Sequence, residues 1–216
     1  MADARMEHED VTAIDIALEP DPTTRDFACE VNARLREGFP DGYALGEDHH
    51  PHVTVLQRFV ASDALDIAAA IARNVVAEED VPAWNLTAIG HHYIAHPPVG
   101  LAAIVIEAPD ELHRLQRRLI DSLAPYVRPA GTADAFASIV GGSDIQEPLI
   151  EYVGTFVPSA SGAHFRPHIS TGVGTIDDLD RLLAEPFQPF DLAVAEVTMF
   201  QIGTFGTARR RLHSLL

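Results

Sequence analysis

A short pattern that occurs twice constrains this chain more than any other feature. Residues 51–54 read Pro-His-Val-Thr, and residues 167–170 read Pro-His-Ile-Ser. Alternate side chains of a β-strand point to the same face, so each copy would place a histidine and a hydroxyl on one face and an apolar residue on the other. Two such strands can bury their apolar residues in a core and present two histidine–hydroxyl pairs outward.

Hydrophobic periodicity predicts that the two copies occupy equivalent places in a repeated order of elements. In the first half the expected elements are a strand at 11–18, a helix at 23–38, the motif strand from 51 to about 60, a helix at 64–76 and a strand at 84–94. In the second half they are a strand at 100–108, a helix from 109 onward, the motif strand at 165–173, a helix at 177–183 and a strand at 190–202, followed by a last strand at 209–215. Thr23 and Thr175 are the expected N-caps of two helices. The order indicates an internal duplication.

The second half is longer than the first. The first strands begin near Ala13 and Leu101, an offset of 88 residues, whereas His52 and His168 are 116 residues apart. The difference of 28 residues is close to the length of a segment at 129–163 that is rich in Gly, Ser, Ala and Pro and in which 149–157 could form a strand. This insertion is expected beside the second motif, as a lid or substrate-selecting loop or else as a plain solvent loop.

Length and composition limit the class of protein. The 216 residues, 47% of them hydrophobic, suit one domain, with lobes expected at about 11–98 and 99–216. The net charge of −17 disfavours binding to long nucleic acids and to anionic membranes, but it permits a small phosphorylated ligand beside a local arginine cluster. No apolar run is long enough to span a membrane, and the acidic N-terminus is unlike a secretory signal peptide. We therefore expect a cytoplasmic monomer.

The basic residues exclude several chemistries. All fifteen are arginine, so the chain has no lysine for a Schiff base, a lysyl-adenylate or a P-loop. The single cysteine, Cys29, excludes an internal disulfide and a cysteine-based zinc site. It is expected to be a small buried side chain and not a nucleophile.

The two histidines offer acid–base chemistry. An imidazole has an ordinary pKa of about 6.5, so near neutral pH one of His52 and His168 can accept a proton while the other donates one. Thr54 and Ser170 share the faces of their histidines and can donate hydrogen bonds to a phosphate oxygen held between the rings. This combination predicts cleavage of a phosphodiester without a metal or other cofactor. It leaves open which histidine is the acid.

The two motifs, in duplicated halves, resemble those of the two-histidine (2H) phosphoesterases, the superfamily of bacterial 2′-5′ RNA ligase-like proteins and cyclic nucleotide phosphodiesterases. The resemblance covers roughly residues 11–215 and lies in the motifs and in the order of elements. It implies a bilobal α+β fold with two antiparallel sheets around a central cleft. It also implies metal-independent hydrolysis of a small 2′,3′-cyclic, 2′-5′-linked or cyclic-oligonucleotide phosphodiester. Carried over by position, His52 and His168 are the acid–base pair, and Thr54 and Ser170 bind phosphate.

Other residues are candidates for substrate contacts. Arg58 and Arg166 flank the motifs and could meet phosphate charge. Tyr93 and Phe165 could stack on a base, although core packing explains them equally well. One residue of the arginine run at 209–211 could also reach the site.

Two rival functions stay open. The same histidines and hydroxyls could bind a small phosphorylated or cyclic nucleotide without turning it over. Further histidines could instead hold a metal ion for metal-dependent hydrolysis; they are His49, His50, His91, His92, His96 and His164. No carboxylate stands at a recognisable ligand spacing from them, so surface or loop roles are expected.

Overall fold

The computed structural model describes residues 10–137 and 145–216, which form an α+β fold. The elements found in these residues are β1 (Val11–Pro20), α1 (Pro22–Gly38), β2 (Val53–Ala61), α2 (Leu65–Ala77), β3 (Asn85–His96), β4 (Val99–Ile106), α3 (Asp110–Leu123), β5 (Val127–Arg128), α4 (Glu147–Ala160), β6 (His168–Thr175), α5 (Ile176–Ala184), β7 (Phe190–Ile202) and β8 (Ala208–Ser214). Outside the insertion, each expected element is present within a few residues of its predicted bounds. No helix in the described ranges is long and apolar enough to cross a membrane.

The strands pair antiparallel and join into one sheet. Their order is β1-β2-β6-β4-β3-β7-β8, with β5 beside β2. Strand β7 pairs twice, because residues 190–193 lie against β3 and residues 194–201 lie against β1. We call β5, β2, β1, β8 and the second part of β7 the first strand group, and β6, β4, β3 and the first part of β7 the second strand group. The two sheets that the resemblance implied are therefore continuous, through β7 and through contact between β2 and β6.

Each strand group is built from elements of both halves of the chain. Strand β1 pairs with β2 and β7, and β4 pairs with β6 and β3. Helix α1 follows β1 in the chain but packs on β6, whereas α3 follows β4 but packs on β2. Each group therefore contains strands from both of the stretches 11–98 and 99–216. A division of the chain between residues 98 and 99 does not separate the groups, because β3 of the first half pairs with β4 of the second, and β7 of the second half pairs with β1 of the first.

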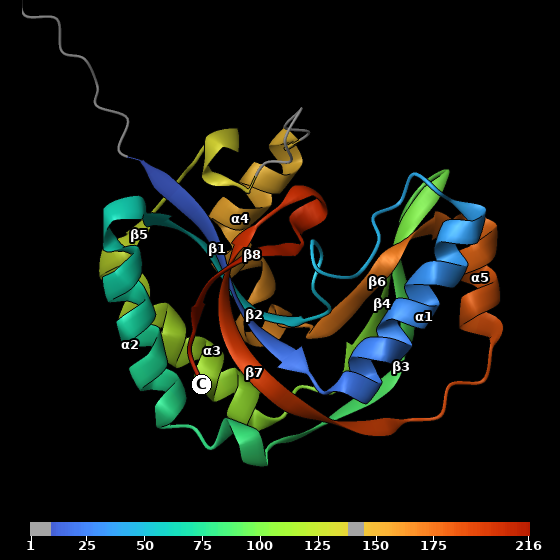
Figure 1. Ribbon diagram of the computed structural model, residues 1–216, viewed down its shortest axis with the longest axis horizontal. Coiled ribbons are helices and arrows are strands. Elements are labelled where there is room, and N and C mark those ends of the chain that lie inside the picture. Colours follow the sequence, from blue (N-terminus) through green and yellow to red (C-terminus); the bar gives the residue numbers. More distant parts are fainter. Residues whose placement is uncertain (1–9, 138–144) are drawn as a thin grey trace, which may run out of the picture.

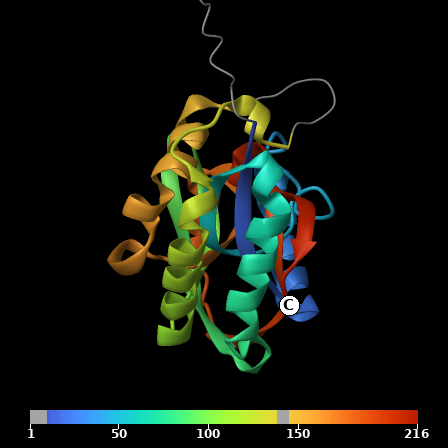
Figure 2. The same ribbon diagram turned by 90° about the vertical axis from the view of Figure 1, so that its left-hand side faces the viewer.

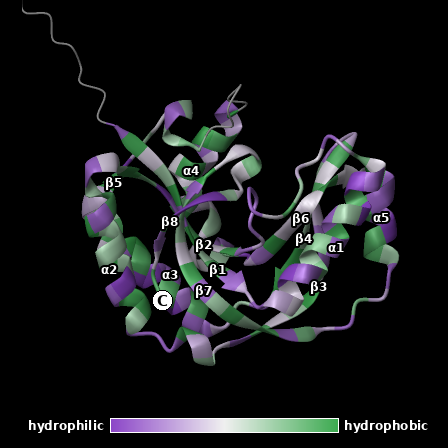
Figure 3. Ribbon diagram, in the orientation of Figure 1, coloured by the Kyte–Doolittle hydropathy of each residue, from purple (hydrophilic) through white to green (hydrophobic). Residues whose placement is uncertain are grey.

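The helices cover the sheet in two sets. Helices α2 and α3 lie side by side against the first strand group, and α1 and α5 lie against the second (Figures 1 and 2). Helix α3 presents leucines at positions 112, 115, 119 and 123, all fully buried, which is the spacing of one helical face. Burial of each such side chain contributes about 1.5–3 kcal/mol. Figure 3 shows hydrophobic residues along the strands and alternating with hydrophilic residues on the helices.

The insertion contains a helix where the sequence suggested a strand. Residues 149–157 belong to α4, in which Val153 and Phe156 are buried and Leu149 and Ile150 are partly buried. These positions recur at the spacing of one helical face, and that face packs on β2 around Phe59. Tertiary packing therefore favours a helix in this segment, although its many β-branched residues favour a strand.

The two predicted helix caps have different outcomes. Asp21 and not Thr23 caps α1, because its side chain accepts a hydrogen bond of 3.0 Å from the backbone N–H of Thr24. Pro22 then occupies the first helical turn, where its missing N–H is not needed. Thr175 caps α5 as predicted, and its hydroxyl accepts from the backbone N–H of Asp178 at 3.2 Å.

Candidate active site

The two motif strands meet at one residue pair. Strands β2 and β6 lie near the centre of the molecule (Figure 1), and Val53 of β2 pairs with Ile169 of β6. Both side chains are buried, so this contact belongs to the main hydrophobic core. The residues directly before Val53 and Ile169 are the two motif histidines, and the fold therefore brings them onto neighbouring strands.

The register of this pair puts the four motif side chains on one face. In an antiparallel ladder, extension by one residue in each direction sets His52 opposite Ser170 and Thr54 opposite His168. Opposite residues lie on the same side of a sheet, and residues two apart in a strand do too. We call this side the motif face.

Each motif strand has a bulge directly after its hydroxyl residue. The pairing of β2 with β1 skips Val55, and the pairing of β6 with β4 skips Thr171. A bulge shifts the alternation of the side chains that follow it. Gln57 therefore joins the motif face, whereas Arg58 pairs with Ile14 and points to the opposite, core side. The structure does not bring Arg58 to the motif residues.

The two imidazoles are held in the same way. Nδ1 of His52 lies 2.6 Å from the carbonyl oxygen of His50, and Nδ1 of His168 lies 2.8 Å from the carbonyl oxygen of Arg166. A carbonyl oxygen only accepts hydrogen bonds, so Nδ1 of each ring carries a proton. Nε2 is therefore the nitrogen of each ring that can exchange a proton with a substrate.

A carboxylate lies beneath the first motif. Asp15 of β1 is fully buried, and its Oδ2 accepts hydrogen bonds from the Thr54 hydroxyl at 2.8 Å and from Nε2 of Gln57 at 2.7 Å. The same oxygen lies 3.5 Å from Nε2 of His52. The sequence motifs did not point to Asp15, but a lone acidic residue inside an apolar strand is a signal that could have found it.

The two histidines have pKa values displaced in opposite directions. Burial alone would lower the pKa of His52, but the negative charge of Asp15, with its Oδ2 3.5 Å from Nε2, outweighs burial and raises that pKa above its usual value. Burial lowers the pKa of His168, and the charges of His52 and His92 lower it further; the hydrogen bond to Arg166 and the charge of Asp15 oppose this without outweighing it. The ring of His52 therefore holds its titrating proton more tightly than the ring of His168 does.

The two hydroxyls also differ. The Thr54 hydroxyl donates its hydrogen bond to Asp15, so it has no proton left to donate to a phosphate oxygen. The Ser170 hydroxyl is partly exposed and makes no hydrogen bond to any other part of the described chain. Ser170 is therefore the better placed of the two to donate to a bound phosphate oxygen.

Strands β4 and β3 extend the motif face into a mostly apolar wall. Ser170 pairs with Ala103, which pairs with the exposed His92. Farther along the strands, Leu101 and the half-exposed Ile94 lie on the same face. A nucleobase could lie against such a wall, with His92 beside His168 at its polar end.

Helix α4 of the insertion brings an aromatic side chain to this region. Tyr152 is 43% exposed, and its ring meets the buried ring of Phe156 edge-on at 5.8 Å. Burial raises the pKa of Tyr152, and the charge of Asp15 raises it further. The hydroxyl of Tyr152 is therefore within electrostatic reach of the carboxylate under the first motif.

Of three predicted substrate contacts, two have side chains that are used elsewhere. Tyr93 lies on the face opposite His92, and its hydroxyl donates to Asp180 of α5 at 2.6 Å. Phe165 is buried in the main core and meets the ring of His113 edge-on at 5.5 Å. Arg166 is exposed beside His168, and one of its nitrogens donates to two carbonyl oxygens of the preceding turn. Of these three, only Arg166 has a side chain free to approach a ligand.

The arginine run at 209–211 contributes one residue beside the first motif. The guanidinium of Arg211 lies 5.4 Å from the ring centre of Phe200 and is ion-paired with Glu19. A pocket of about 440 Å³ is lined by Arg211 together with His50 and Pro51, the two residues that precede His52. Arg211 is thus a cation close to the candidate site.

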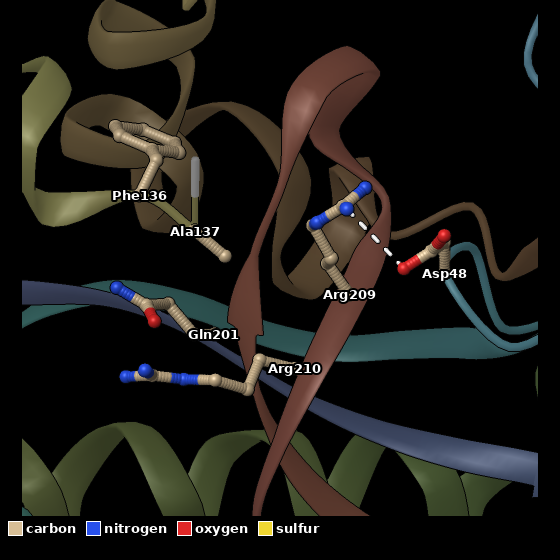
Figure 4. Close-up of a pocket in the computed structure, with 6 residues that line it drawn as sticks. All are labelled: Asp48, Phe136, Ala137, Gln201, Arg209 and Arg210. Atoms are coloured by element: carbon tan, nitrogen blue, oxygen red, sulfur yellow. Dashed lines mark hydrogen bonds and ion pairs between the residues drawn. The ribbon is translucent and has the colours of Figure 1, made fainter. Parts of the chain in front are cut away.

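A second pocket lies apart from the motif residues. It has a volume of about 390 Å³, and its lining residues, drawn in Figure 4, are Asp48, Phe136, Ala137, Gln201, Arg209 and Arg210. Arg209 is ion-paired with Asp48 at 3.2 Å. None of the four motif residues lines it, and the acid–base site does not depend on it.

The remaining histidines do not gather into a ligand set. Within residues 10–137 and 145–216 no three side chains of His, Cys, Asp or Glu are placed to hold a metal ion. His49 hydrogen-bonds the Thr207 hydroxyl at 2.7 Å, and the His91 ring packs against Phe187. Cys29 is partly buried and not fully so, and burial raises the pKa of its thiol, which disfavours a nucleophilic thiolate.

The fold is shared with solved structures of low sequence identity. The crystal structure of TT0787 of Thermus thermophilus matches with a TM-score of 0.51 and 16% identity, over 94% of this chain and 96% of that one. Crystal structures of E. coli LigT complexed with phosphate and with 3′-AMP each have a TM-score of 0.41, with 11% and 13% identity, over 95% of this chain and 96% of theirs. No protein-family model and no curated protein matches the chain. The likeness to TT0787 shows a common fold over nearly the whole length of both proteins.

Proposed function

We propose that the protein is a phosphodiesterase that hydrolyses a small nucleotide phosphodiester, such as a 2′,3′-cyclic, 2′-5′-linked or cyclic-oligonucleotide one, by two-histidine acid–base catalysis without a metal. The observation that carries the proposal is the pair of imidazoles on one face of neighbouring strands. Both have Nδ1 held by a backbone carbonyl, and each has a hydroxyl two residues on. The resemblance of both motifs to those of the 2H phosphoesterases supports the same reaction.

The chemistry needs only these groups and water. One imidazole, neutral at Nε2, takes a proton from a water molecule whose oxygen bonds to phosphorus. The other donates its Nε2 proton to the ribose oxygen whose bond to phosphorus breaks, and the product is a phosphomonoester. The two rings exchange protonation states in the step, and proton exchange with solvent restores them. The Ser170 hydroxyl would donate a hydrogen bond to a non-bridging oxygen and so stabilise its charge.

The surroundings favour a small substrate. The net charge of −17 opposes the approach of a long polyanion, whereas Arg211 and Arg166 offer local positive charge beside the two motifs. Tyr152 and the apolar wall around Leu101 and Ile94 offer surface for one or two bases. A nucleotide or short oligonucleotide satisfies both conditions.

Substitution of the histidines tests the proposal. His52→Ala and His168→Ala should each lower kcat/KM for hydrolysis by about 10²–10⁴-fold, because each removes one partner of general acid–base catalysis. His96→Ala, at an exposed position at the end of β3, is the matched control and should keep full activity. Hydrolysis should also survive chelation of divalent metals. Full activity in either motif variant, or an absolute requirement for added metal, contradicts the proposal.

Product analysis separates catalysis from simple binding. The protein is incubated with a panel of 2′,3′-cyclic, 3′,5′-cyclic and 2′-5′-linked nucleotides, and phosphomonoester products are followed by chromatography. The proposal expects product from at least one of these classes. Tight binding with no product from any of them would indicate a binding module that uses the same face.

A further inference from the structure

The two motifs are chemically alike, but only one of them has a buried carboxylate. Within the described residues, Asp15 is the acidic side chain that contacts a motif histidine, through Oδ2 at 3.5 Å from Nε2 of His52. The position in the second half that corresponds to Asp15 follows from the strand register. Asp15 lies opposite Gln57 beyond the first bulge, and Leu101 lies opposite Val173 beyond the second. Leucine at this position shows that the strand pairing itself does not require a carboxylate.

The environment of Asp15 is poorly suited to a purely structural role. Its side chain is fully buried, and its Oδ1 has no hydrogen-bond partner in the described chain. A buried oxygen without a partner destabilises a fold by about 1–3 kcal/mol, so an apolar residue would serve packing better. The Oδ2 contacts with Thr54 and Gln57 instead fix the carboxylate beneath Nε2 of His52.

We propose that Asp15 is a positioning residue that makes His52 the proton donor and leaves His168 as the proton acceptor. The assignment rests on the proposed phosphodiesterase function and goes beyond it by giving the two rings different roles. The negative charge of Asp15 stabilises the imidazolium of His52, as a buried aspartate stabilises an imidazolium in other acid–base sites. The charge of Asp15 also acts on His168, but there burial outweighs it and favours the neutral ring.

The length of the contact leaves the proton available. At 3.5 Å the separation of Nε2 and Oδ2 exceeds that of an ordinary hydrogen bond, so the Nε2 proton of His52 is not committed to Asp15. In the reaction this proton passes to the ribose oxygen that leaves phosphorus, while Nε2 of His168 receives the proton of the attacking water. The position of Asp15 thereby sets the direction in which a substrate lies across the motif face.

Other charged groups around His52 bear on its protonation. They are Asp15 and Glu19 of β1, His50 in the segment before β2, His168 of β6, and Arg211 of β8, which is ion-paired with Glu19. Glu19 acts in the same direction as Asp15, but it is partly neutralised by Arg211. Asp15 is therefore the side chain whose removal should change the protonation of His52 most.

The test combines an isosteric variant with two readouts. Asp15→Asn should lower the midpoint of His52 in an NMR titration of the histidine rings by at least about one pH unit and should move the midpoint of His168 much less. In the pH dependence of kcat/KM, the limb at high pH, which reports the acid, should move down by a similar amount. Glu19→Gln, which removes the other acidic neighbour of His52 and keeps Asp15, is the matched control and should lower the midpoint of His52 less than Asp15→Asn does. Thermal unfolding of both variants shows that they are folded.

The titration also separates this inference from the proposed function. If His52 titrates below His168 in the unmodified protein, or if Asp15→Asn moves neither midpoint, the role of Asp15 is contradicted whatever the activity. If the titrations behave as expected but His52→Ala and His168→Ala keep full activity, the phosphodiesterase proposal fails, and the coupling of Asp15 to His52 stands as a property of the fold.

Discussion

The first and second motifs differ in their surroundings far more than in their sequences. In the first, His52 is 8% exposed and faces Asp15, which also accepts a hydrogen bond from the Thr54 hydroxyl. In the second, His168 is more open, no carboxylate contacts it in the described chain, and the Ser170 hydroxyl is free. A repeated pattern thus supplies two similar histidines, and one substitution in a neighbouring strand is enough to give them different tasks.

The hydroxyls give the largest expected contrast. Ser170→Ala should lower kcat/KM by about 10²-fold, as removal of one donor to a developing oxyanion does in other enzymes, with little effect on the free energy of unfolding. Thr54→Val should have the opposite profile. It removes a hydrogen bond to buried Asp15 and should lower the free energy of unfolding by about 1–3 kcal/mol. Equal kinetic losses in the two variants, measured together with urea unfolding, would remove the distinction between the motifs.

The insertion gives a smaller effect that concerns the substrate. Tyr152→Ala removes an exposed ring of α4 whose pKa responds to the charge of Asp15. It should raise KM for a nucleotide substrate by an amount equivalent to about 1–3 kcal/mol, with kcat less affected, because stacking of a base is lost. Tyr152→Phe keeps the ring and serves as the matched variant with near-normal KM. An unchanged KM in Tyr152→Ala would place the base elsewhere, for example on the wall formed by Leu101 and Ile94.

Much of the architecture could be predicted because it depends on local patterns. The α+β class, the order of elements and the cap at Thr175 follow from periodicity and capping chemistry, which act within a few residues. The convergence of His52 and His168 was expected from the repeated motif. The helix in the insertion was not, because its face is defined by contact with Phe59, far away in the chain.

The parts of the site that could not be predicted depend on register. The bulges at Val55 and Thr171 cannot be read from residue type, and the first of them turns Arg58 away and brings Gln57 forward. Pairing across β3 and β4 likewise puts His92 and not Tyr93 on the motif face. Asp15 could have been noticed in the sequence, since it interrupts an apolar strand, but its contact with His52 could be known only from the fold.

A change of leaving group tests the difference between the two histidines most directly. In a nucleoside p-nitrophenyl phosphodiester the leaving phenolate is weakly basic and departs without a proton, so hydrolysis of this diester needs a base but no acid. His52→Ala should therefore recover most of the activity of the unmodified protein on this substrate, whereas His168→Ala should stay as impaired as it is on a ribose phosphodiester. Equal impairment of the two variants, or recovery of His168→Ala in place of His52→Ala, would contradict the assignment of His52 as acid and His168 as base.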